Sequence, residues 1–238
     1  MRAVIIGASG GIGRALVEAL SERSDFEAIH AYARSSIDWA PAKALSGHID
    51  LRDEASIAVA AKAVANDGPP DLVFVATGIL SNETGLQPEK SLRHQSADAF
   101  EQVFAINTIG PALVAKHFIP IMPRQTRAVF AALSARVGSI SDNRLGGWHA
   151  YRASKAALNM LVQNYAIEQG RRNEHFIAVS LHPGTVDTAL SKPFQGNVPE
   201  GQLFSADTSA RVLLDVIARL KPADSGKCFD WAGKPIPA

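Results

Sequence analysis

Short apolar segments rich in β-branched residues alternate with longer amphipathic segments along the whole chain. The short segments predict seven strands, at residues 3–6, 27–33, 44–49, 71–76, 128–133, 176–181 and 227–231. Helices are expected between them, because apolar residues such as Ile12, Leu16 and Leu20 recur on one helical face. This alternation is typical of a parallel sheet with helices on both faces. The pattern therefore predicts a doubly wound α/β fold in which residues 1–238 form a single domain.

One segment, residues 190–205, interrupts this pattern. It contains two prolines and two glycines and shows little periodicity, so we expect a substrate loop long enough to act as a lid. Three aromatic residues in this loop and in residues 139–148, namely Trp148, Phe194 and Phe204, hint at an apolar pocket. Packing against the domain or against a partner subunit is the alternative for each of them.

The composition argues against several classes of protein, including disordered and nucleic-acid-binding proteins. Hydrophobic residues make up 47% of the 238 residues and charged residues 20%, and 24 basic minus 23 acidic residues give a net charge of +1. Such a chain can bury a sizeable core, which argues against disorder and against a nucleic-acid partner. The single cysteine, Cys228, excludes an internal disulfide, and no histidine or cysteine spacing is typical of a metal site.

The apolar runs are short. None reaches the roughly 18 residues of a bilayer span, and the stretch 3–8 is too short for the core of a secretory signal. We therefore expect a soluble, cytoplasmic protein with no membrane partner.

A glycine-rich turn follows the first predicted strand and leads into a predicted helix. Residues 7–13 read GASGGIG. Glycines let the backbone turn tightly and approach a pyrophosphate, whose charge is stabilised by the free N–H groups and the dipole at the helix N-terminus. A plain strand-to-helix turn is the alternative, but the strand before and the helix after favour a dinucleotide site of the Rossmann type.

The residue that selects the dinucleotide is expected after the second strand. An acidic side chain there accepts a ribose 2′-hydroxyl, whereas an arginine accommodates a 2′-phosphate. Arg34 lies 21 residues after Gly13, and no carboxylate occurs before Asp38. NADP(H) is therefore the preferred cofactor and NAD(H) a possible one, unless Arg34 is a simple surface arginine.

A tyrosine and a lysine lie four residues apart at the start of a helix predicted to end near Gly170. This spacing places Tyr151 and Lys155 on one helix face. A phenol is a poor acid at neutral pH, but a nearby ammonium lowers its pKa and makes it a usable proton donor. An ordinary aromatic beside an exposed lysine is the alternative, and the glycine turn upstream argues against it.

A proline interrupts a helical pattern at residues 97–118. Pro111 has no N–H to offer the carbonyl of Asn107. That carbonyl must find water or a side chain, so the predicted kink could hold a water beside the lysine. A kink required only for packing is equally compatible with the sequence.

These motifs, in this order, resemble the classical short-chain dehydrogenase/reductase family over essentially the whole chain. The turn at residues 7–13 is similar to the family's TGxxxGxG with Ile6 in place of the threonine, residues 50–51 to its adenine-contacting position, YRASK at 151–155 to YxxxK, and PGTVDT at 183–188 to PGxVxT. VATG at 75–78 departs from the family pattern, because it stands where the family usually reads NNAG. Residues 134–155 and 226–230 resemble the branch with C-factor-like proteins and sniffer-type carbonyl reductases.

The resemblance implies specific roles. Tyr151 would protonate a carbonyl oxygen, Lys155 would hold the nicotinamide ribose, Asn107 would anchor a relay water, and a serine would polarise the carbonyl. The implied cofactor contacts are Gly7, Ser9, Gly11, Ile12, Gly13, Arg34, Asp50, Leu51, Ala76, Thr77, Gly78, Asn107, Tyr151, Lys155, Pro183, Gly184, Val186 and Thr188.

The catalytic serine is the main departure from the family pattern. The family's Ser-Ser reads Ser134-Ala135 here, and the second position normally carries catalysis. Strand alternation turns Ser134 to the other face, unless a bulge turns it inward, and Ser139 lies in the following loop. We expect Ser134 to take the role, with Ser139 as the alternative, and slow turnover if neither hydroxyl reaches the carbonyl.

Three functions are compatible with these residues. The first is an NADPH-dependent reductase acting on a small carbonyl or alcohol substrate. The second is a dinucleotide-binding signalling or regulatory protein with little turnover, which Ala135 favours. An epimerase or dehydratase, which usually has a longer chain, comes last. By analogy with the family, the chain is expected to form a homodimer or homotetramer.

Overall fold

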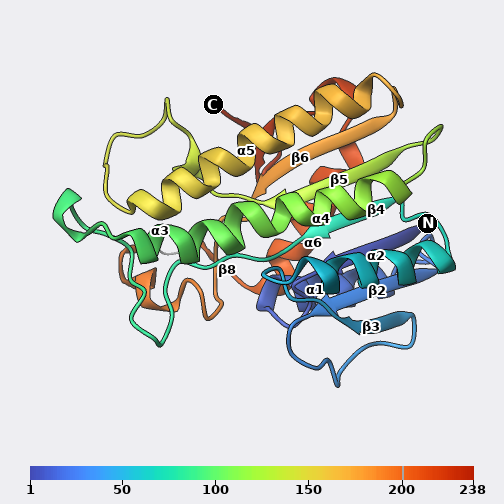
Figure 1. The fold of residues 1–238 in the computed structure, drawn as a ribbon, viewed down its shortest axis with the longest axis horizontal. Helices are drawn as coiled ribbons and strands as arrows, with labels where there is room; N and C mark the ends of the chain where they lie inside the picture. The colour runs from blue at the N-terminus through green and yellow to red at the C-terminus, as the bar shows by residue number, and fades with distance from the viewer. Residues whose placement is uncertain (200) are drawn as a thin grey trace.

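The computed structural model describes residues 1–199 and 201–238 and shows one large twisted sheet between two layers of helices (Figure 1). The eight strands lie in the order β10-β9-β6-β5-β4-β1-β2-β3. All neighbouring pairs are parallel except β9 and β10, which are antiparallel. The strands are β1 (Arg2–Ile6), β2 (Ala28–Ala33), β3 (Ala44–His48), β4 (Leu72–Val75), β5 (Ala128–Leu133), β6 (Phe176–His182), β9 (Cys228–Asp230) and β10 (Pro235–Ile236).

The doubly wound α/β prediction is confirmed, but the predicted number of strands is wrong. All seven predicted strands are present, with ends that differ by at most one residue. The eighth strand, β10, has only two residues and pairs antiparallel with β9 at the sheet edge. A strand this short carries no detectable alternation, so the hydrophobic pattern could not predict it.

Two apolar cores lie on opposite faces of the sheet. Helices α1 (Gly11–Ser21) and α6 (Ala206–Arg219) cover one face, where Leu16, Leu20 and Leu213 are buried. Helices α2 (Glu54–Asp67), α4 (Gly110–Phe118) and α5 (His149–Gly170) cover the other face, where Phe118 and Leu158 are buried. Strand side chains alternate between the two cores, which explains the nearly continuous apolar strands of the sequence.

The interrupted helix is continuous but contains a π-helical turn. Helix α3 (Ala97–Phe104) passes through a π-helical segment, Ala105–Ile109, into α4. There the N–H of Gly110 bonds to the carbonyl of Ala105, five residues back, just before Pro111, which has no N–H to donate. The predicted irregularity therefore takes the form of a π turn.

The same helical stretch, Ala97–Ile121, is long and apolar enough to span a membrane by length and composition. Its buried face carries Val114, Ala115 and Phe118, which belong to the core on the α5 side of the sheet. We therefore interpret its apolar character as that of a core helix.

The predicted lid, residues 190–205, is not a structureless loop in its described part. It contains a 3₁₀ helix, Lys192–Asn197, and a two-residue strand β8 (Leu203–Phe204) that pairs with β7 (Thr185–Val186). The ring of Phe204 packs against Trp231 with ring centres 4.8 Å apart. The ring of Phe204 therefore packs this segment against the residue that follows β9. Residue 200 lies outside the described residues.

Candidate active site

A cavity of about 930 Å³ opens at the carboxyl ends of the central strands. Its wall includes the glycine turn after β1, the segment after β4, the ends of β5 and β6, and the face of α5 with Tyr151 and Lys155. Strands β1 and β4 are neighbours from which the chain continues in opposite directions along the sheet. In open α/β sheets ligands bind at this topological switch point.

The structure brings together twelve of the residues predicted from the sequence on the wall of this cavity. They are Gly11, Ile12, Ala76, Thr77, Gly78, Ser134, Tyr151, Lys155, Pro183, Gly184, Val186 and Thr188. The other seven lie off the wall, namely Gly7, Ser9, Gly13, Arg34, Asp50, Leu51 and Asn107.

The glycine turn is shaped for a close approach of the backbone. Gly7 has a φ of +92°, a region that favours glycine. Gly10 begins α1 without a side-chain cap. A methyl group at Gly11 would lie 2.8 Å from Cγ2 of Thr188, so the turn and the segment after β6 nearly touch. The turn thus offers the N–H groups of a helix start to an anion.

Gly13 allows this turn to close, and its replacement tests that role. A Cβ at this position would lie 2.1 Å from the carbonyl oxygen of Gly7, so Gly13→Ala must push two backbone segments apart. We expect a loss of about 2 kcal/mol or more in the free energy of unfolding, measured by urea denaturation.

Gly10→Ala is the matched control for this prediction. Its Cβ would lie 3.4 Å from the same oxygen, and its φ of −81° suits any residue. We expect a loss below about 1 kcal/mol. Equal losses for the two variants would contradict the packing role of Gly13.

The residues expected at the adenosine end lie beside the turn rather than in the cavity. The N–H groups of Gly7 and Ala8 both bond to the carbonyl of Tyr32 in β2, so Arg34, two residues further, follows close by and is exposed. The Asp50 carboxylate accepts the N–H of Arg52. Leu51 is 5% exposed and belongs to the core.

Tyr151 and Lys155 lie together on the buried face of α5. Tyr151 is 9% exposed and Lys155 2%. The Nζ atom of Lys155 lies 5.8 Å from the centre of the Tyr151 ring and donates a hydrogen bond of 2.8 Å to the carbonyl of Leu133 at the end of β5. Gly138 permits this packing, because a Cβ there would lie 2.7 Å from Cβ of Lys155.

The predicted direction of the tyrosine pKa is wrong in this structure. Burial raises the pKa of Tyr151 to about 12 and lowers the pKa of Lys155 to about 8, because it disfavours the charged form of each group. The spacing showed that the two side chains share a face, but it could not show how completely both are removed from water. At neutral pH Tyr151 therefore carries its proton, as a proton donor requires.

Asn107 does not line the cavity; its side chain connects the segment after β4 to helix α5. Its fully buried amide accepts the N–H of Ile79 at 2.8 Å and donates to the carbonyl of Ile79 at 2.9 Å and to Oγ of Ser154 at 3.2 Å. Thr108 Oγ1 donates to the carbonyl of Ser154. The π turn thus fixes the segment after β4 to α5, one residue before Lys155.

Neither predicted serine presents a free hydroxyl to the cavity. Ser134 lies on the wall, but its Oγ donates to Oδ1 of Asn159 on α5 at 2.8 Å. Ser139 is 3% exposed, lies off the wall and accepts the N–H of Asp142. Ala135 occupies the remaining position, in an apolar cluster with Leu80 and Tyr151. The sequence showed that residue 135 lacks the expected hydroxyl, but it left open whether Ser134 or Ser139 replaces it.

Trp148 forms the aromatic wall beside Tyr151. The two ring centres are 6.2 Å apart in an edge-to-face arrangement, and Phe194 lies 5.3 Å from Trp148. Trp148 is the only non-glycine residue with positive φ in the described chain, at +50°, and it follows Gly146 and Gly147, which also have positive φ. Such backbone strain persists only where the surroundings enforce it.

Glu89, which sequence reasoning missed, holds this strained start of α5. Its carbonyl accepts the N–H of Trp148 at 2.6 Å, and its buried carboxylate accepts the N–H of Ala150. A carboxylate at a helix N-terminus replaces the absent side-chain cap and favours the helix dipole. Glu89 is about sixty residues away in sequence, so no local signal reveals it.

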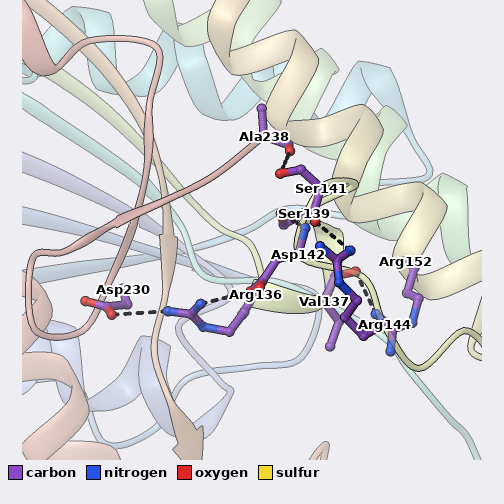
Figure 2. A network of polar contacts seen from close by, with 9 residues as sticks. All are labelled: Arg136, Val137, Ser139, Ser141, Asp142, Arg144, Arg152, Asp230 and Ala238. Carbon is purple, nitrogen blue, oxygen red and sulfur yellow. Dashed lines mark hydrogen bonds and ion pairs between the residues drawn. The ribbon is translucent and has the colours of Figure 1, made fainter.

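A second polar network braces the segment between β5 and α5 (Figure 2). Arg136 pairs with Asp142 at 2.9 Å and with Asp230 at 3.5 Å. Arg152 donates to the carbonyl of Val137, and Ser141 donates to the carbonyl of Ala238. These contacts tie the segment that ends at Trp148 to β9, to α5 and to residue 238.

Comparison with known proteins agrees with this geometry. The profile of the short chain dehydrogenase family matches residues 1–198. The chain belongs to this family. It is therefore an NAD(P)-dependent oxidoreductase of the short-chain dehydrogenase/reductase type.

Three relatives illustrate the likeness. C-signal of Myxococcus xanthus is 38% identical over 136 residues, which are 57% of this chain and 76% of that protein. NADPH-bound carbonyl reductase from chicken fatty liver is 26% identical with a TM-score of 0.85, covering 100% and 98% of the two chains. Carbonyl reductase Sniffer of D. melanogaster, 22% identical over 100% and 99%, has the same TM-score and shows the shared fold.

Proposed function

We propose that this short-chain dehydrogenase is an NADPH-dependent reductase of small carbonyl compounds. The observation that carries the proposal is one continuous cavity, which runs from the glycine turn to a buried, protonated tyrosine with a lysine at its side. The apolar surroundings of Tyr151 suit an uncharged carbonyl substrate. The carbonyl reductases among its structural neighbours support the same substrate class.

The residues present fit a nicotinamide dinucleotide. Gly7 and Gly13 keep side chains out of the turn, Thr77 Oγ1 is buried with no partner in the described chain, and α1 offers its N-terminus. Gly11 to Gly13 would face the pyrophosphate, Lys155 the ribose, and residues 183–188 the nicotinamide. When bound, the cofactor supplies the hydride.

Tyr151 performs the proton step in this mechanism. Its hydroxyl, protonated at neutral pH because its pKa is about 12, donates a proton to the carbonyl oxygen as negative charge develops there. The ammonium of Lys155, 5.8 Å from the ring centre, stabilises the phenolate that results. Asn107 keeps the segment after β4 and α5 in register. We retain its anchoring of a relay water as a proposal.

Arg34 is proposed to select NADPH over NADH. Its exposed guanidinium follows β2 beside the glycine turn, where a 2′-phosphate would lie, and we expect Asp50 and Leu51 to border the adenine. Arg34→Asp removes a charge-assisted contact and adds a like charge. We expect the Kd for NADPH to rise about 30-fold or more, and the Kd for NADH to change less than about threefold, measured by fluorescence titration.

Arg124→Asp is the control for this substitution. It makes the same change of charge on an exposed residue before β5, at the opposite end of the sheet, and should leave both Kd values within about twofold. If Arg34→Asp weakened NADPH and NADH equally, Arg34 would not read the 2′-phosphate.

One observation favours a second function. C-signal, by its name a signal, is 38% identical to part of this chain, and Ala135 leaves the cavity without the expected hydroxyl. A dinucleotide-binding signalling protein would bind NADPH without turnover. Incubating the protein with NADPH and a panel of aromatic ketones, aldehydes and diketones separates the two functions, since only the reductase consumes NADPH.

The quaternary structure and location are also proposals. Ile109 on the π turn and Met160 and Ile167 on α5 are exposed apolar residues on the outer helices. They support a homodimer or homotetramer formed through α4 and α5, which sedimentation would test. A cytoplasmic location agrees with the single free cysteine.

A further inference from the structure

The cavity lacks an obvious second hydrogen-bond donor for the carbonyl oxygen. Negative charge develops on this oxygen during reduction, and donors fixed in place before the reaction stabilise it. Tyr151 supplies one donor. Ala135 supplies none, the Ser134 proton is used by Asn159, and Ser139 lies off the wall. Any second donor must come from another wall residue.

His182 lies beside this gap. It is the last residue of β6, and the register pairs Leu133 of β5 with Leu181 of β6. The N–H of Ser134 bonds to the carbonyl of Leu181 at 2.8 Å. His182 is therefore the direct neighbour, on the adjoining strand, of Ser134, the residue before Ala135. The side chain of His182 lines the same cavity as Tyr151.

The ring of His182 is in the right state to donate one hydrogen bond. Burial lowers its pKa to about 4, with a further lowering by the Arg136 charge that Asp230 partly opposes. A neutral imidazole carries one N–H. Nδ1 is buried with no partner in the described chain, so a proton on Nδ1 would be a buried donor without an acceptor, which is costly. Nε2 is not among the enclosed atoms without a partner, so in the tautomer with the proton on Nε2 the N–H is the ring group that can reach a ligand.

Two other polar side chains on the wall, those of Arg136 and Thr77, do not fill this gap. The guanidinium of Arg136 is already paired with Asp142 and Asp230 (Figure 2). Thr77 has an unpartnered hydroxyl, but its Cγ2 would lie 2.8 Å from a Cβ at Gly7, which places it at the phosphate end. Of these three side chains, only His182 both has an unpaired ring nitrogen and lies on the strand beside Ser134.

We propose that His182 is a catalytic residue, whose Nε2–H donates a hydrogen bond to the substrate's carbonyl oxygen in place of the hydroxyl absent at residue 135. The inference rests on the proposed reductase function. In the step, hydride adds to the carbonyl carbon, the C=O π electrons move to oxygen, and Tyr151 transfers its proton to that oxygen, which gives the alcohol. His182 keeps its proton throughout and only stabilises the charge.

Two substitutions of His182 test the donor. His182→Leu removes the N–H and should lower kcat for an aromatic ketone about 100-fold, because one oxyanion donor contributes about that much. His182→Gln keeps an N–H donor and should lower kcat less than about tenfold. His182→Phe, which keeps the volume of the ring, takes the place of the leucine variant should that variant not fold. The matched control is His149→Leu, which also removes a buried, unpartnered ring nitrogen, but off this wall, and should leave kcat within about threefold.

Restoring a hydroxyl at residue 135 separates a catalytic from a structural role. If His182 stands in for that hydroxyl, Ala135→Ser should restore the kcat of His182→Leu to within about tenfold of the wild type. A histidine that only supported the fold would not be replaced by a serine on the neighbouring strand. A double variant no faster than His182→Leu would overturn the proposal.

Ligand binding provides a readout that does not depend on turnover. With the protein saturated by NADP⁺, His182→Leu should raise the calorimetric Kd of an aromatic ketone about tenfold and leave the Kd of NADP⁺ unchanged. An unchanged kcat and ketone Kd in His182→Leu would overturn this inference alone. A wild-type protein that binds NADPH but reduces no carbonyl would overturn the proposed function, and this inference with it.

Discussion

Replacing Tyr151 by phenylalanine should lower kcat about 1,000-fold or more, because it removes the hydroxyl that protonates the carbonyl oxygen. The ring remains, so its contacts with Trp148 and with the apolar cluster are kept. The hydroxyl has no hydrogen-bond partner within the described chain, so its loss leaves no unpaired group. The measurement is the steady-state rate of NADPH consumption with a saturating carbonyl substrate.

Cofactor binding is the control for this variant. The Kd of Tyr151→Phe for NADPH should lie within about threefold of the wild-type value, since the glycine turn and Arg34 are untouched. A rate within about tenfold of wild type would remove Tyr151 from the chemistry. A large loss of NADPH affinity would instead assign it to binding.

Lys155→Met should lower kcat about 100-fold and remove a pH dependence. The pKa of Lys155 is lowered to about 8, so the ammonium is present below pH 8 and lost above it. Tyr151, with its pKa raised to about 12, stays protonated throughout. The wild-type rate of reduction should therefore be constant below about pH 7 and fall about tenfold per unit above pH 8.

The pH profile distinguishes the charge of Lys155 from its packing. In Lys155→Met the rate should be low and flat over the same range, because no group that titrates near pH 8 remains beside Tyr151. Lys192→Met, a change in an exposed lysine near the cavity mouth, should keep the wild-type profile. A fall above pH 8 that persisted in Lys155→Met would assign the titration to another group.

The arrangement of the sheet could be predicted because each strand obeys a local rule. The strand residues 128–133 are apolar throughout, and the chain on both sides turns polar, so β5 was found at its observed bounds. The short strands β7, β8 and β10 have two residues each. Their existence depends on pairing partners rather than on their own sequence, so no local pattern marks them.

The candidate site likewise contains features that a local sequence pattern predicts and features that depend on contacts between distant segments. Spacing alone predicted that Tyr151 and Lys155 share a face of α5, because four residues make about one helical turn. The contact of Asn107 with Ile79 and Ser154 joins three separate segments, and the position of Glu89 under Trp148 joins two more. Such contacts arise from tertiary packing, which a single sequence does not encode locally.

Two further differences between the predicted and the observed site, at Ser134 and Tyr151, come from the packing of α5 against the sheet. The Ser134 hydroxyl was expected to reach the substrate, yet it donates a hydrogen bond of 2.8 Å to the side-chain oxygen Oδ1 of Asn159 on α5. Strand alternation indicated that Ser134 and Ala135 face opposite sides, but it could not show that Asn159 takes the Ser134 hydroxyl. The pKa of Tyr151 moved opposite to expectation because burial outweighs the lysine 5.8 Å away. Neither outcome follows from residue types and spacing alone.

The most direct test of the central claim follows the transferred hydrogen itself. NADPH carrying deuterium at the transferable position of the nicotinamide would be incubated with the protein and an aromatic ketone, and the product examined by mass spectrometry. We predict an alcohol that has gained one deuterium on the former carbonyl carbon, formed at least about 1,000-fold more slowly by Tyr151→Phe. Tight NADPH binding with no labelled alcohol from any ketone, aldehyde or diketone would contradict the reductase function.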